Sequence, residues 1–163
     1  MENKVDNVDF VNSINRILWE FTTKDYDDIL YDVHVCFDYN EVKKTFNNIE
    51  NDNLDLKPVI HYSLQPIENS ARTIVSQGIQ GERNFLEYFV YVVIDYNYKS
   101  HIPRYMLLNQ ISGKLKHKFD NYKKELDEFH IVKLTPNEGV LGENADGLIA
   151  TQHELTFRVD REI

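Results

Sequence analysis

The feature that most constrains the fold is a run of β-branched and aromatic residues from Phe85 to Tyr98 (FLEYFVYVVIDYNY). Residues of these types favour strands. A straight strand over this run would be about 46 Å long, since each residue adds about 3.3 Å. A compact chain of 163 residues has a diameter of about 40 Å. We therefore expect the strand to cross the whole molecule, and to twist, bend or project from it.

Two other segments have the periodicity of amphipathic helices. From about residue 7 to residue 22, apolar side chains recur at every third or fourth position, and Asp6 or Asn7 is a suitable cap for the start. A second run of the same kind covers 104–126, directly after Pro103. Because each run has a single apolar stripe, we expect two helices that each bury one face.

Shorter patterns account for the rest of the chain. Strands are indicated by alternation of apolar and polar residues, and a short helix by apolar residues at helical spacing. Glycine and polar residues indicate the connections. The expected elements are strands over 29–39, 59–65, 129–134 and 148–159, a short helix over 41–49, a long connection over 66–84 with room for one short strand, and a Gly-rich loop over 135–147.

This order of elements predicts an α+β fold. We expect a mostly antiparallel, twisted sheet, with the N-terminal helix and the long helix of the C-terminal half packed on one face. The length is that of one ordinary domain, so a single domain over 1–163 is predicted.

Two helices are too few to cover both faces of such a sheet. Some apolar sheet surface should remain uncovered, and a large exposed apolar patch usually indicates a partner. Two sets of side chains alternate along the long strand, and either is a candidate for this surface: Tyr88, Val90, Val92, Ile94 and Tyr96, or Phe85, Phe89, Tyr91 and Val93.

Charge is distributed unevenly along the chain. The net charge is −9, but residues 1–56 carry −8 and residues 104–126 carry +4. A net acidic chain is poorly suited to nonspecific binding of phosphate backbones. Lys114 and Lys118 are predicted to face away from the apolar stripe of their helix. They could bind the acidic segment of a second copy and join copies head to tail, so that reversing both charges would weaken self-assembly.

No catalytic signature is present. The sequence has no glycine-rich phosphate loop, no GxSxG, no HExxH and no CxxC. Cys36 is the only cysteine, which excludes an internal disulfide and fits a reducing, intracellular compartment. His34, Cys36 and His61 would supply three metal ligands if their strands pair, but a buried cysteine explains the pattern more simply. We therefore predict no enzyme activity, no metal and no cofactor.

No membrane segment is predicted either. The chain has no run of 18 apolar residues, and its N-terminus is acidic rather than basic and then apolar.

Over nearly its whole length, the chain resembles the tail-terminator proteins of long-tailed bacteriophages. The resemblance lies in the order and length of the elements. These are the N-terminal amphipathic helix, the long strand YFVYVVIDYNY, the long helix RYMLLNQISGKLKHKF, the strand FHIVKL, a Gly-rich loop and a last strand containing LTFRV. The short helix over 41–49 and the connection over 66–84 depart from the family pattern.

The resemblance implies a structural virion protein with no enzymatic activity and no cofactor. Six copies would form a ring at the head-proximal end of the tail, where the ring ends growth of the tail tube and provides the surface on which the head docks. Its partners would be itself, the tail-tube protein and neck or connector proteins of the head. DNA would pass through the lumen without specific binding. The protein would reside in the virion, and in the host cytoplasm during assembly.

In that arrangement the segments 66–84 and 135–147 are the expected contacts with tube or head. The charged residues expected to matter there are Arg72, Arg83, Glu138 and Glu143.

Three alternatives remain open. A neck or head-completion connector would share the same features but bind the head side. A small α+β enzyme would use Cys36 with His34 or His61. A cytosolic binding module with an aromatic sheet face would be a monomer or dimer and would never form rings.

Overall fold

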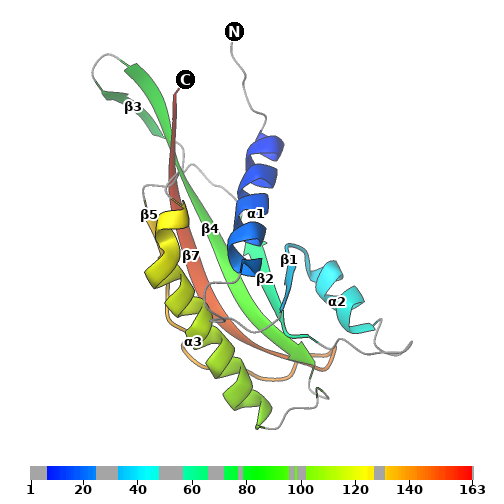
Figure 1. The fold of residues 1–163 in the computed structure, drawn as a ribbon. Helices are drawn as coiled ribbons and strands as arrows, with labels where there is room; N and C mark the ends of the chain where they lie inside the picture. The colour runs from blue at the N-terminus through cyan, green and yellow to red at the C-terminus, as the bar shows by residue number, and fades with distance from the viewer. Residues whose placement is uncertain are drawn as a thin grey trace.

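A twisted sheet flanked by helices makes up the fold (Figure 1). The computed structural model describes residues 7–24, 33–47, 57–65, 72–76, 79–95, 98, 102–126 and 131–162. Its elements are α1 (Asn7–Thr23), β1 (His34–Cys36), α2 (Tyr39–Asn47), β2 (Val59–Leu64), β3 (Arg72–Ser76), β4 (Ile79–Asp95), α3 (Arg104–Tyr122) with a 3-10 turn (Lys123–Leu126), β5 (Ile131–Leu134), β6 (Val140–Leu141) and β7 (Leu148–Glu162). None of the described helices is both long and apolar enough to cross a bilayer.

The sheet is mostly antiparallel, as predicted, and the fold is α+β. Its strand order is β1-β2-β4-β7-β5, with β3 paired to β4 and β6 paired to β7. Only β1 and β2 are parallel among the described pairs. This follows from the connection, because α2 lies between these two strands in sequence and lets the chain return in the same direction.

The long strand β4 is longer than predicted and starts earlier. It begins at Ile79 rather than Phe85, and ends at Asp95 rather than Tyr98. Its first residues pair with β3 on one side and with β7 on the other, from Gly81 onward. The resulting hairpin projects beyond the helices at the upper left of Figure 1. The interpretation of 79–84 as part of a connection was wrong, since backbone pairing to β3 and β7 holds this stretch although it contains Gly81 and polar residues.

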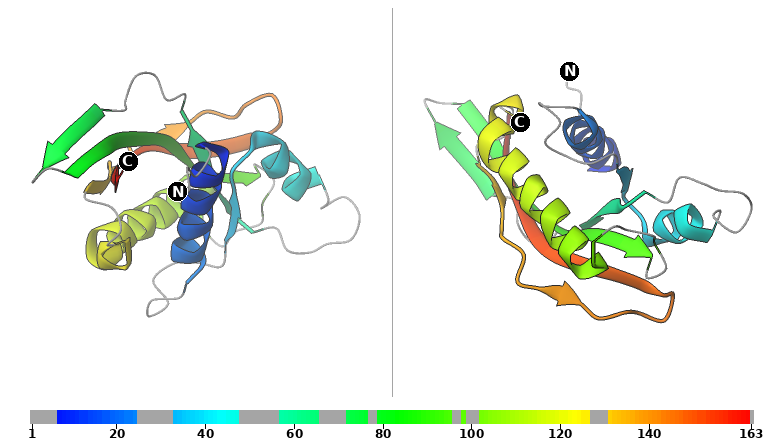
Figure 2. Two further views of the ribbon diagram at one scale, coloured as in Figure 1. Left: turned by 90° about the horizontal axis from the view of Figure 1, so that it is seen from above. Right: turned by 60° about the horizontal axis from the view of Figure 1, so that its bottom comes forward.

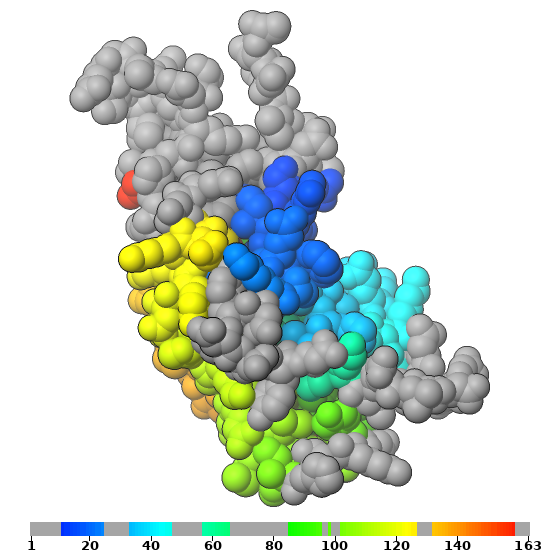
Figure 3. All heavy atoms as spheres, viewed as in Figure 1, coloured from blue at the N-terminus to red at the C-terminus, as the bar shows by residue number. Residues whose placement is uncertain are grey.

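Helices α1 and α3 pack against the same face of the sheet, which we call the inner face. From this side little of β4 and β7 is visible in the space-filling view (Figure 3). The even-numbered residues of β4 from Leu86 to Ile94 point to this face and are buried, so the candidate set Tyr88, Val90, Val92 and Ile94 is core. Tyr96, the last member of that set, lies outside the described residues. The core residues shared by the helices and β4 are Ile14, Leu18, Phe21, Leu108, Ile111, Leu115, Tyr88, Val90, Val92 and Ile94.

Helix α2 lies against the opposite face, which we call the outer face. Its Val42 and Phe46 pack with Cys36, Val59 and Val93 in a second buried cluster. Val59 is paired with Val93 in the β2–β4 register, and side chains alternate between faces along a strand. The cluster is therefore on the other side of the sheet from Ile60 and Val92, and α2 covers one end of the outer face.

The predicted strand over 29–39 is too long at its C-terminal end. β1 ends at Cys36, residues 37 and 38 form a bend, and α2 begins at Tyr39; residues 29–32 lie outside the described part. The helix start is capped reciprocally. Asp38 Oδ1 accepts a hydrogen bond from Asn40 N at 2.8 Å, and Glu41 Oε2 accepts one from Phe37 N at 3.1 Å. An acidic pair at this spacing is a helix-start signal that outweighs the apolar alternation.

Candidate functional site

The outer face is covered only in part. Phe85, Phe89, Tyr91 and Val93 of β4 point to it. Val93 is buried beneath α2, whereas the three aromatic side chains remain half-buried. Of the two sets of β4 side chains proposed from the sequence, the odd-numbered one therefore forms the uncovered aromatic surface in the described part of the chain.

A pocket of about 380 Å³ opens on this face between α2, the sheet and the loop that follows β6. Val93, Leu148 and Ala150 line it from β4 and β7. The lining also includes Leu141 at the end of β6, the loop residues Gly142 and Asn144, and Tyr39, His61, Ser63 and Tyr91. The size is at the lower end of the range for ligand pockets and would suit one or two large side chains.

His61 is the buried titratable group of this pocket among the described residues, since Tyr91 is half-buried and Tyr39 is exposed. It is 8% exposed, and the centroids of the Tyr39 and Tyr91 rings lie 6.3 and 5.7 Å from that of its imidazole. Burial lowers the pKa of His61, against the opposing effect of Asp38 and Glu41. A neutral imidazole has one donor and one acceptor nitrogen, and neither has a hydrogen-bond partner in the described ranges. The pocket therefore offers an unused hydrogen bond among apolar groups.

The loop that closes the pocket is tied to the first residue of α2. The Tyr39 hydroxyl donates to Asp146 Oδ2 at 2.6 Å and accepts from Asn144 Nδ2 at 2.9 Å. Asn144 Oδ1 accepts from the backbone N–H groups of Asp146 and Leu148. Gly147 has φ +73°, in the left-handed region that favours glycine. These bonds hold the loop against the outer face.

A second hollow, of about 340 Å³, lies beside the earlier part of the same loop and includes Thr135, Glu138 and His153 in its lining. His153 is 2% exposed, and its Nδ1 donates to the Thr135 carbonyl at 2.7 Å. Its Nε2 is buried and has no partner among the described residues. Burial lowers the pKa of His153; the Thr135 bond acts in the opposite direction and Lys116 adds to the lowering.

The predicted contact residues divide between two places. Arg72 is paired with Arg83 in the β3–β4 register, so the backbone brings these two positions together at the base of the projecting hairpin. Glu138 and Glu143 are exposed on the loop 135–147. Leu148, just beyond Glu143, pairs with Asp95 at the other end of β4, about 40 Å along the strand from Arg83. The structure therefore does not join Arg83 and Glu143 in one surface.

The predicted position of Lys118 was wrong. Its side chain is buried, 1% exposed, and Nζ donates to the carbonyls of Thr22 and Lys24 at 2.8 and 2.6 Å. Lys118 follows Ile111 by seven residues and Leu115 by three, which is the spacing of the apolar stripe itself. Lys114 is half-buried on the same helix.

Cys36 is a poor candidate nucleophile. It is buried, and burial raises the pKa of its thiol above 9.0. Cys36 is paired with His61 in the β1–β2 register, as the hypothetical metal site requires. The described residues nevertheless contain no group of three or more His, Cys, Asp or Glu side chains that could hold a metal ion.

We expect a thiol reagent to label Cys36 at least about 100-fold more slowly in the native protein than in urea, because labelling requires local opening of the cluster around α2. Absorbance during reaction with an aromatic disulfide measures both rates. Native labelling as fast as that of a small free thiol would contradict this and would favour the alternative of an enzyme that uses Cys36.

Sequence reasoning missed the pocket itself. It considered His61 as a metal ligand or as the partner of a Cys36 nucleophile, and it did not connect Tyr39 with Asn144. The turn from Asn144 to Gly147 was the only part of the pocket with a recognisable local sequence pattern. No such pattern connects Asn144 with Tyr39, which lies 105 residues earlier in the chain.

Comparison with known proteins adds no family to this geometry: no protein-family model matches the chain, and no curated protein matches it.

Proposed function

We propose that this protein is a structural subunit of a bacteriophage tail, a tail terminator that forms a ring at the head-proximal end. The observation that carries the proposal is the β4–β7 ribbon. It pairs continuously from Gly81–Glu162 to Asp95–Leu148 and connects two separate regions that are suited to contacts, the projecting hairpin and the loop beside the outer pocket.

A ring that joins a tube to a head needs two contact surfaces facing different partners. The hairpin extends past both helices on the inner face (Figure 1), and the loop 135–147 lies at or toward the other end of β4. A rigid ribbon between them would fix their separation. The half-buried aromatic residues on the outer face supply a further surface for contacts between neighbouring copies. The number of subunits, six, comes from the family resemblance, as do the virion location and the tube and head partners.

A ring should be visible directly. We expect native mass spectrometry and negative-stain microscopy over a concentration series to show closed hexamers, and purified tail tubes lacking their terminator to bind the protein at one end and stop elongating. Failure to form rings or to bind either tubes or heads would contradict the proposal.

Variants can test the projecting hairpin and the loop 135–147 separately as contact regions. Arg72→Glu with Arg83→Glu is expected to weaken binding to one of the two partners, tube or head, and Glu143→Lys to weaken binding to the other. Cosedimentation with purified tubes and with purified heads measures both. Binding to heads alone, with no effect on tubes, would support the neck connector instead.

A further inference from the structure

We propose that the pocket on the outer face receives the first turn of α3 from a second copy of this chain, with Tyr105 as the inserted side chain. The inference rests on the proposed ring and specifies how its neighbouring copies meet. The pocket is suited to such an occupant because its lining is mostly apolar and because it contains the His61 imidazole, which has no hydrogen-bond partner among the described residues.

The surroundings of the pocket are acidic. Asp38 and Glu41 are close enough to His61 to affect its protonation. Glu143 and Asp146 belong to the closing loop, and all four carboxylates are on exposed residues. Lys43, over the Tyr39 ring at 5.9 Å, is the nearby base. In the described part of the chain, four carboxylates and one ammonium leave a charge of −3 around the pocket, which favours an occupant that is apolar at its tip and positive around it.

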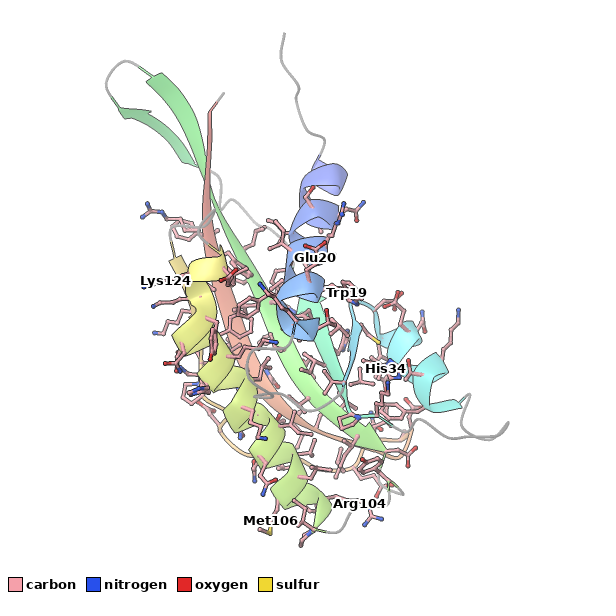
Figure 4. The ribbon with its side chains drawn as sticks, in the orientation of Figure 1. Trp19, Glu20, His34, Arg104, Met106 and Lys124 are labelled. Carbon is pink, nitrogen blue, oxygen red and sulfur yellow. The ribbon has the colours of Figure 1, made fainter. Side chains whose placement is uncertain are left out.

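The start of α3 has this combination. Tyr105 and Met106 are 45% and 53% exposed, and Arg104 precedes them. Figure 4 shows Arg104 and Met106 at the free end of α3, directed away from the sheet. The first turn contains no acidic residue, and Pro103 provides no side-chain cap. The positive end of the helix dipole therefore lies at the exposed side chains of Tyr105 and Met106 without a carboxylate of its own helix to offset it.

Other exposed apolar side chains fit less well. Tyr39 and Leu141 belong to the pocket itself. Trp19 on α1 is 49% exposed, but it lies beside the Arg16–Glu20 ion pair, which has no net charge to match the acidic rim. In the described part of the chain, the start of α3 is thus the exposed apolar group with the complementary charge.

The chemistry of the pocket suits a tyrosine. Its ring would pack with the rings of Tyr39 and Tyr91, and its hydroxyl would hydrogen-bond to a nitrogen of neutral His61. Met106 would then lie at Leu141 on the rim, where an adaptable thioether chain packs well.

The arrangement requires two molecules. The pocket is on the outer face. Helix α3 packs on the inner face, on the same side of the sheet as α1 (Figure 2, left). A contact between two different patches is head-to-tail, and it continues from copy to copy until a ring closes.

Pairwise cross-linking of full-length chains tests the contact. In a Cys36→Ala background, one protein carries Met106→Cys and another Leu141→Cys, and the two are mixed under mild oxidation. We expect a disulfide-linked heterodimer on a non-reducing gel, and little homodimer from either protein alone. Trp19→Cys mixed with Leu141→Cys is the matched control, because Trp19 is as exposed as Met106. No heterodimer, or one that forms equally well with Trp19→Cys, would overturn the inference.

Self-association provides a second readout. Tyr105→Ala with Met106→Ala should weaken association by tenfold or more, on the order expected for a central anchor, whereas Trp19→Ala should leave it unchanged; circular dichroism checks that each variant is folded. Rings that form and cap tails without the cross-link would refute this contact and leave the tail-terminator proposal intact. Cross-linked copies that bind neither tubes nor heads would support the contact and refute the proposed function.

Discussion

Replacement of Lys118 by glutamate is expected to unfold the protein, whereas the same substitution at exposed Lys124 should change the free energy of unfolding by no more than about 0.5 kcal/mol. The difference arises from what Lys118 contacts. Its Nζ donates to the Thr22 and Lys24 carbonyls, at the end of a helix whose last turn has no basic residue of its own. Lys118 thus supplies from α3 the cation that stabilises the C-terminus of α1.

A carboxylate at this position would face carbonyl oxygens at the negative end of a helix, in a buried place that also contacts the Phe21 ring, 5.6 Å from Nζ. Lys118→Met separates charge from packing, because it retains most of the apolar stem and removes the donor. We expect a loss of about 1.5–3 kcal/mol, the usual contribution of hydrogen bonds from a charged group. Urea unfolding followed by circular dichroism measures both variants. A Lys118→Met protein as stable as the parent would contradict the assignment.

This prediction affects how assembly is tested. Charge reversal at Lys118 would abolish assembly by unfolding the subunit, and the result would be misread as the loss of an interface. Exposed residues such as Tyr105 and Met106 avoid this ambiguity.

The two long helices and their buried faces could be predicted because the side chains that become buried recur at helical spacing in the sequence. The first helix was predicted over about 7–22 and spans Asn7–Thr23. The second was predicted over 104–126, where the structure has α3 followed by a 3-10 turn that ends at Leu126. In both, a single apolar stripe faces one sheet, so the local pattern and the tertiary environment agree.

The errors arise where a local pattern conflicts with another signal. The alternation up to Tyr39 predicted a strand, but the carboxylates of Asp38 and Glu41 start a helix there. Lys118 has the spacing of the apolar stripe, and its charge alone suggested the surface. The outer pocket could not be predicted at all, because its closure depends on the contact between Tyr39 and Asp146, 107 residues apart, and contacts at such separation leave no local signal.

Acidification from pH 7 to pH 5 is expected to lower the free energy of unfolding through His61 and His153. Burial lowers the pKa of each below the ordinary value of 6.5. Between the folded-state pKa and 6.5, the unfolded chain binds more protons than the native protein. The contribution of the two neutral histidines to the free energy of unfolding is therefore fully present above pH 6.5. It falls as the pH decreases through this window, by at most about 1.4 kcal/mol per pH unit for each histidine.

Variants that cannot titrate should flatten this dependence. His153→Gln removes the titrating group and keeps an amide donor for the Thr135 carbonyl. His61→Gln removes the titrating group of the outer pocket. Urea unfolding at pH 7, 6 and 5 measures each slope, and a parent slope that persists in the double variant would contradict the prediction. If the free energy of unfolding of the single variant His61→Gln depends less on pH than that of the parent, the His61 imidazole is neutral at pH 7. A neutral imidazole is the form whose acceptor nitrogen can bind the hydroxyl of an inserted tyrosine.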